Sequence, residues 1–91
     1  MTGPTRPAWR VELSDPAQKD IARIPRPERE RILDALSALA EDPYQQQVRR
    51  LVGRPEWRLR VGDRRALLQV DERNRVIVVT AIGPRGDVYK G

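Results

Sequence analysis

The sequence predicts a small α+β domain in which a helical hairpin packs on one face of a mostly antiparallel four-stranded sheet. Three observations give this fold class. Apolar side chains recur at helical spacing over residues 17–24 and again over 32–40. Apolar and charged side chains alternate over residues 57–61, the period of a half-buried strand. An apolar run over residues 76–79 is typical of a strand inside a sheet. The expected order of elements is β-α-α-β-β-β.

Length and composition bound the organisation of the chain. Its 91 residues suffice for one hydrophobic core, so we expect a disordered arm over residues 1–7 and a single domain over 8–91. The sequence has no cysteine and no histidine, which removes disulfides, thiolate sites and the commonest metal ligand. We therefore expect neither a metal nor a cofactor. No apolar run is long enough to span a bilayer and no signal peptide is evident, so a cytoplasmic location without membrane contact is predicted.

The basic residues are nearly all arginines. The formal charge is +5, and 18 basic residues less Lys19 and Lys90 leave sixteen arginines. A genome rich in arginine codons explains such an excess without any function. Bidentate recognition of phosphate or carboxylate explains it functionally, because the guanidinium group suits planar anions better than an ammonium group. Only the placement of the arginines distinguishes the two explanations.

The N-terminal half predicts a strand followed by a short helix. Apolar residues alternate with charged ones over residues 9–13, which indicates the first strand. Asp15 is suited to cap the helix that follows, with Pro16 at the first helical position and Gln18 where a capping box needs it. Pro25 is expected to end this helix.

A second helix is expected to begin near Pro27 and to stop before Pro43. Its predicted apolar stripe consists of Ile32, Leu33, Leu36, Leu39 and Ala40. Residues 42–55 are polar, and the length of this connection suggests a functional loop.

Residues 56–70 predict a β-hairpin that gathers arginines on one face. Gly62 and Asp63 form a two-residue turn with glycine first, as a type II′ turn prefers. This turn pairs Val61 with Arg64, and it places Arg60 directly opposite Arg65. Trp57 shares a face with Leu59, so core packing is expected for its ring.

Because side chains two residues apart share a face of a strand, Arg58, Arg60 and Arg65 are expected to project together. Directly opposed like charges cost about 0.2–1 kcal/mol per pair, and a bound anion would offset that cost. The alternative is a solvated face whose arginines pair with acidic residues of the same chain. With helices sealing the other face, the basic surface is suited to a nucleic-acid strand.

The last predicted strand covers residues 76–82 and follows a turn at Arg73-Asn74. It is apolar on both faces, so it is expected inside the sheet. Arg85 comes next on a Gly/Pro-rich turn, where a side chain is more often positioned for function than for packing.

The order and spacing of these short motifs resemble the RelE/ParE superfamily of bacterial toxins, and its RelE-like branch more closely. The resemblance runs from about residue 9 to the end of the chain. Its strongest motif is Trp57-Arg58-Leu59-Arg60-Val61-Gly62-Asp63-Arg64-Arg65. Others are Ala17-Gln18-Lys19-Asp20-Ile21 with Ile24-Pro25, Asp42-Pro43, Leu51-Val52-Gly53, and Ile82-Gly83 followed by Arg85 and Asp87-Val88-Tyr89.

The resemblance implies a RelE-like fold and the toxin of a type II toxin–antitoxin pair. Such toxins cleave messenger RNA in the decoding site of the 30S ribosomal subunit, without a metal, through attack of a 2′-hydroxyl that leaves a 2′,3′-cyclic phosphate. A cognate antitoxin silences them, and operator DNA is bound only through that antitoxin. The residues at the family's functional positions are Arg58, Arg60, Arg65, Arg85 and Tyr89.

The chain departs from the family pattern at the groups that move protons. Many relatives carry His-Arg where this chain has Pro84-Arg85, and Arg60 stands where lysine is common. An arginine is a poor base, because it stays protonated in proteins. Tyr89, a carboxylate such as Asp87 or Glu56, and a ribosomal group are therefore all candidates for acid and base.

Two other functions remain open at this point. One is a ParE-like toxin that inhibits DNA gyrase and is not a nuclease. The other is a degenerate toxin that acts only as an antitoxin-binding co-repressor.

Overall fold

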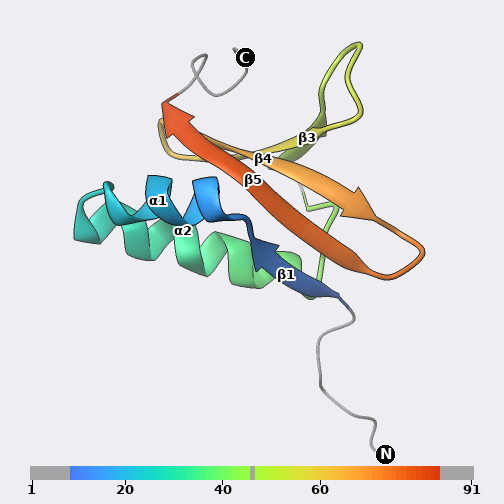
Figure 1. The fold of residues 1–91 in the computed structure, drawn as a ribbon, viewed down its shortest axis with the longest axis horizontal. Helices are drawn as coiled ribbons and strands as arrows, with labels where there is room; N and C mark the ends of the chain where they lie inside the picture. Colours follow the sequence, from blue (N-terminus) through green and yellow to red (C-terminus); the bar gives the residue numbers. More distant parts are fainter. Residues whose placement is uncertain (1–8, 46, 85–91) are drawn as a thin grey trace, which may run out of the picture.

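Both helices lie on one face of a single mixed sheet (Figure 1). The computed structural model describes residues 9–45 and 47–84. Its five strands have the order β1-β5-β4-β3-β2, and only the β1–β5 pair is parallel. The elements are β1 (Arg10–Leu13), α1 (Asp15–Ala22), α2 (Arg26–Leu39), β2 (Val48–Arg50), β3 (Trp57–Val61), β4 (Arg64–Asp71) and β5 (Val76–Pro84). The predicted α+β class with its helical hairpin is confirmed.

The prediction of four strands is wrong by one, because β2 lies within the expected loop of residues 42–55. It pairs antiparallel with β3, with Val48 beside Leu59, Arg49 beside Arg58, and Arg50 beside Trp57. A strand of three residues is too short to show a period of two. Strand β2 is defined by its pairing with β3, and the sequence of these three residues alone does not reveal that pairing.

The start of α1 differs from the prediction by one residue. Ser14 is the N-cap, and its side chain accepts a hydrogen bond from the backbone N–H of Ala17 at 3.2 Å. Asp15 lies in the first turn instead, where its negative charge interacts favourably with the positive end of the helix dipole. Gln18 does not close a capping box, because its Nε2 donates to the carbonyl of Leu13 at 3.1 Å.

The second helix begins at Arg26, directly after Pro25, and ends at Leu39. Of its predicted apolar stripe, Ile32, Leu36 and Leu39 are buried, whereas Leu33 is 40% exposed. Leu33 follows Ile32 by one position, which turns its side chain about 100° away from the buried stripe.

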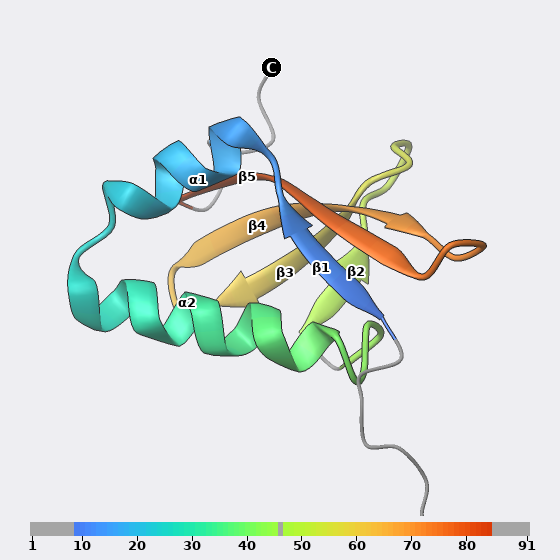
Figure 2. The same ribbon diagram turned by 60° about the horizontal axis from the view of Figure 1, so that its bottom comes forward.

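The core lies between the helices and the sheet (Figure 2). Leu59, Leu68, Ile77 and Val79 of the sheet are completely buried in it, and Trp57 packs against its edge, as predicted. Strand β5 lies between β1 and β4, which confirms its predicted place inside the sheet.

Strand β5 extends to Pro84, two residues beyond the predicted end at residue 82. Besides the hydrogen bond from the Ser14 backbone N–H to the Val79 carbonyl at 2.9 Å, two side chains tie helix α1 and its N-cap to β5. The Ser14 hydroxyl donates to the Thr80 carbonyl at 3.2 Å, and the Asp20 carboxylate accepts from the Ile82 N–H at 2.9 Å. These bonds fix the end of β5 against the helical layer.

Several expectations concern residues outside the described ranges, namely the disordered arm of residues 1–7 and the positions of Arg85 and Tyr89. Within the described ranges, neither helix has the length and apolarity that crossing a bilayer requires.

The bond between Asp20 and β5 yields a stability prediction. Asp20→Ala removes a charged acceptor from a buried backbone N–H, so it should lower the free energy of unfolding by about 1.5–3 kcal/mol. Asp34→Ala, at an exposed position of α2, is the matched control and should stay within about 0.5 kcal/mol of the unmodified chain. Urea denaturation measures both. Equal stabilities of the two variants would contradict an anchoring role for Asp20.

Candidate nucleic-acid interface

The hairpin of β3 and β4 has the predicted turn and register. Gly62 has a φ of +60°, whereas Asp63 is not among the residues with positive φ, as a type II′ turn requires. Val61 pairs with Arg64, and Arg60 pairs with Arg65. A tight turn therefore places two arginines directly opposite each other.

Three predicted site residues share the face of the sheet opposite the helices, called the open face below. Leu59 is completely buried on the helix side, so its neighbours Arg58 and Arg60 point the other way. Arg65 pairs with Arg60 and precedes the buried Ala66, so it also projects from the open face. The predicted common face of Arg58, Arg60 and Arg65 is thus confirmed.

Arg49 adds a fourth arginine to the open face, one that sequence reasoning missed. It pairs with Arg58 across β2 and β3, and its side chain is exposed. A pocket of about 180 Å³ lies among Gln47, Arg49, Arg58 and Arg60. The arginine doublet at residues 49–50 is visible in the sequence, but nothing in it tells which member faces outward.

None of the four open-face arginines forms an ion pair within residues 9–45 and 47–84. The ion pairs found there are Arg10–Glu12, Arg26–Glu30, Arg54–Glu56 and Arg64–Glu28. Arg65 only donates from Nη1 to the carbonyl of Arg64, at 3.3 Å. Pairing with acidic residues, the alternative explanation of this face, is therefore not seen in the described part of the chain. The electrostatic repulsion between these guanidinium groups is therefore not offset by an ion pair with any described carboxylate.

Arg64 shows how strictly the strand alternates. Its Nη2 lies 3.2 Å from Oε1 of Glu28, so this arginine reaches the helical layer while the adjacent Arg65 stands on the open face. Two consecutive arginines thus have different tasks. One joins the hairpin to α2, and the other projects from the open face without an ion pair among the described residues.

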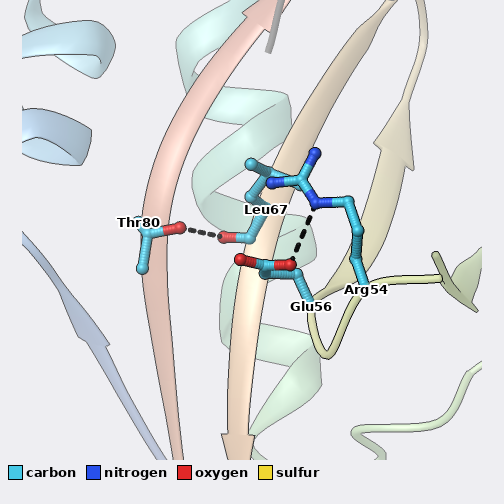
Figure 3. A network of polar contacts seen from close by, with 4 residues as sticks. All are labelled: Arg54, Glu56, Leu67 and Thr80. Atoms are coloured by element: carbon cyan, nitrogen blue, oxygen red, sulfur yellow. Dashed lines mark hydrogen bonds and ion pairs between the residues drawn. The ribbon is translucent and has the colours of Figure 1, made fainter. Parts of the chain in front are cut away.

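Two side chains at the C-terminal end of the loop between β2 and β3 lie over the open face. Figure 3 shows Arg54 and Glu56 in front of β4, with the Arg54 Nε 3.2 Å from the Glu56 Oε1. Beneath them, Leu67 is buried although it is not part of the helix-side core. Nearby, the Thr80 hydroxyl donates to the Leu67 carbonyl at 3.4 Å, where the register between β4 and β5 shifts. This loop therefore borders the arginines on one side.

Of the protein residues that are candidates for proton transfer, only Glu56 lies within the described ranges. Glu56 lies on the open face two residues from Arg58, and its carboxylate is paired with Arg54. Arg85, Asp87 and Tyr89 lie outside the described residues; the last described one, Pro84, pairs with Arg64 beside the hairpin turn. Among the described residues, no three carboxylates come together in a way that could hold a metal ion.

Solved structures with a similar fold include toxins in complex with their antitoxins. The archaeal RelE from Pyrococcus horikoshii, solved with RelB, is 26% identical and has a TM-score of 0.77, with 88% of this chain and 98% of that chain covered. In the RelBE2 complex from Mycobacterium tuberculosis the identity is 17% and the TM-score 0.75, covering 86% and 99% of the two chains. For the intact E. coli RelBE complex the identity is 24% and the TM-score 0.70, with 85% of this chain and 96% of that chain covered.

Sequence comparison gives the family directly. Residues 11–89 match the family described as "ParE toxin of type II toxin-antitoxin system, parDE". No curated protein sequence matches significantly. Because the family match spans nearly the whole chain and the fold agrees with RelE structures, the chain belongs to the ParE toxin family within the RelE/ParE superfamily of type II toxins.

Proposed function

We propose that this chain is a toxin that cleaves messenger RNA on the ribosome and is neutralised by a cognate antitoxin. The observation that carries the proposal is the set of four arginines on the open face that lack ion pairs within the described residues. A phosphodiester is the anion that best suits several guanidinium groups on an exposed sheet. The cytoplasm is the compartment in which such a toxin would meet ribosomes.

The chemistry assigns a task to each group. The 2′-hydroxyl attacks the adjacent phosphorus, the 5′-oxygen leaves, and the products are a 2′,3′-cyclic phosphate and a 5′-hydroxyl. Arg58, Arg60 and Arg65 hold the scissile phosphate in line and stabilise the charge that develops on its oxygens. Arg49 is suited to a neighbouring phosphate, because it stands on the next strand outward.

Two further catalytic residues, Arg85 and Tyr89, follow from the family resemblance. Arg85 would add a positive charge at the phosphate, and Tyr89 would stack on a base or polarise the 2′-hydroxyl. One group must accept the proton of the 2′-hydroxyl and another must protonate the leaving oxygen. Tyr89, Asp87, Glu56 and a ribosomal group remain the candidates.

The partners follow from membership of the family. An antitoxin encoded beside the toxin gene would bind this chain, as RelB binds RelE in the solved complexes. Operator DNA would be contacted through the antitoxin only.

A second candidate function is inhibition of DNA gyrase. It is favoured by the family match, which is to ParE toxins. The absence of histidine points the same way, since it leaves the chain without the commonest acid–base side chain. A toxin that has lost activity and serves as co-repressor is the third candidate, and it would cause no growth arrest when expressed alone.

Arg65→Ala tests the nuclease directly. In a translating extract, the unmodified protein should cut messenger RNA, and the variant should lose at least about a hundredfold in rate because a charge that stabilises the transition state is gone. Cleavage is mapped by primer extension, and circular dichroism checks the fold. Arg23→Ala, at an exposed position after α1, is the control and should cut normally. Inhibition of gyrase supercoiling without RNA cleavage would instead establish the second candidate.

Arg60→Gln should separate stability from binding. Removing one of two opposed charges should raise the free energy of unfolding by about 0.2–1 kcal/mol. It should also flatten the slope of log affinity against log salt for a single-stranded RNA oligonucleotide by about 0.7, the loss of one phosphate contact.

The control for this experiment is Arg64→Gln, which breaks the pair with Glu28. It should lower stability and leave the salt slope unchanged. An Arg60→Gln variant that is less stable than the unmodified protein, or that keeps the full slope, would contradict the anion-binding role.

A further inference from the structure

Three of the four aromatic residues of the chain meet at one place, away from the arginines of the open face. The rings of Trp9 and Tyr44 lie edge to face with centroids 6.2 Å apart, and those of Tyr44 and Trp57 lie tilted at 5.4 Å. The Arg50 guanidinium lies 5.7 Å from the centre of the Trp57 ring. We call these four residues the aromatic surface. The sequence contains two tryptophans, two tyrosines and no phenylalanine, so little aromatic area is left for the rest of the chain.

The aromatic surface lies on the helix side of the sheet, beyond the end of α2. Trp57 packs against the edge of the core and pairs with Arg50, so both point toward the helical layer. The backbone N–H of Trp9 donates to the backbone carbonyl of Ala40, directly after α2, at 3.0 Å. Because α2 ends at Leu39, neither helix of the described part of the chain covers these side chains, and Tyr44 is 44% exposed.

A groove of about 180 Å³ runs over this surface, lined by Tyr44, Arg50, Pro55, Trp57, Val70 and Glu72. Its two charged side chains are in different situations. The Tyr44 hydroxyl donates to the Glu72 carboxylate, which raises the pKa of Tyr44. Arg50, in contrast, has no carboxylate partner among the described residues. The groove therefore offers apolar rings and one guanidinium group that forms no ion pair among the described residues.

These features fit a peptide better than a nucleic acid. The lining of the groove contains one arginine and one glutamate, so it has no net charge and does not attract a polyanion. Tryptophan, tyrosine and arginine are the residues that most often dominate protein–protein binding energy. An apolar side chain from a partner would fill the groove, and an adjacent carboxylate would pair with Arg50.

We infer that the aromatic surface is an anchoring site for the antitoxin, which it binds through a segment carrying an apolar residue next to an acidic one. The inference rests on the part of the proposed function that gives this chain an antitoxin partner. It does not depend on whether the chain cleaves RNA. It places neutralisation contacts on the face opposite the open-face arginines, so it adds a second binding surface to the toxin.

The test measures the affinity of purified toxin variants for the purified antitoxin encoded beside the toxin gene. Tyr44→Ala removes the central ring, and Arg50→Glu reverses the charge at an exposed position that forms no ion pair among the described residues. Each should weaken antitoxin binding about 30-fold or more, the loss typical of a dominant interface residue. Toxicity of both variants, expressed without antitoxin, should be unchanged.

Two matched controls accompany these variants. Val52→Ala truncates another exposed apolar side chain, and Arg23→Glu makes the same charge reversal at the far end of the helical hairpin. Both should bind the antitoxin within about threefold of the unmodified toxin.

Tryptophan fluorescence gives a direct readout, because Trp9 and Trp57 are the only tryptophans of the chain. Antitoxin binding should shift their emission, whereas a single-stranded RNA oligonucleotide on the open face should leave it unchanged. Tight binding by Tyr44→Ala and Arg50→Glu would overturn the inference and leave the proposed function intact. An effect of Arg50→Glu on RNA affinity alone would overturn it in favour of a nucleic-acid contact. An unmodified toxin that does not bind the antitoxin would instead remove the partner on which both rest.

Discussion

The register of the β3–β4 hairpin is the constraint on which the rest of the structure depends. Burial of Leu59 against the helices contributes about 1.5–3 kcal/mol and forces Arg58 and Arg60 onto the opposite face. The two-residue turn then sets Arg65 across from Arg60. A slip by one residue would turn the arginines into the core, where unpaired charges are costly, so the register is strongly specified.

Local periodicity made much of this arrangement predictable. Short-range patterns of apolar and polar residues predicted the hairpin, the pair of helices and the interior position of β5. What could not be predicted depends on contacts between distant segments. Strand β2 is defined only by its pairing with β3, which also decides that Arg49 faces outward. Tyr44 showed no pattern, because its partners Trp57 and Glu72 are brought to it by the fold. Arg85 and Tyr89 remain predictions.

The two surfaces proposed here differ in physical character as well as in position. The open face carries four arginines that form no ion pair among the described residues, an arrangement that favours binding of a polyanion, and such binding weakens with salt. The groove over the aromatic surface, on the helix side, is close to neutral and lined by rings, so it favours a protein segment whose binding depends less on salt. A toxin with this division could be active through one face and anchored by its antitoxin through the other. Substitutions on one surface would then have little effect on binding at the other.

The central claim is that the open-face arginines converge on one phosphodiester backbone. Its most direct test follows the side-chain Nε–Hε resonances of the arginines by NMR as a single-stranded RNA oligonucleotide is added. The resonances of Arg58, Arg60 and Arg65 should shift together, while that of Arg64, held by Glu28 on the helix side, should not move. Shifts confined to Arg23 and the arginines of α2 would contradict the account, because they would place the nucleic acid on the opposite side of the molecule.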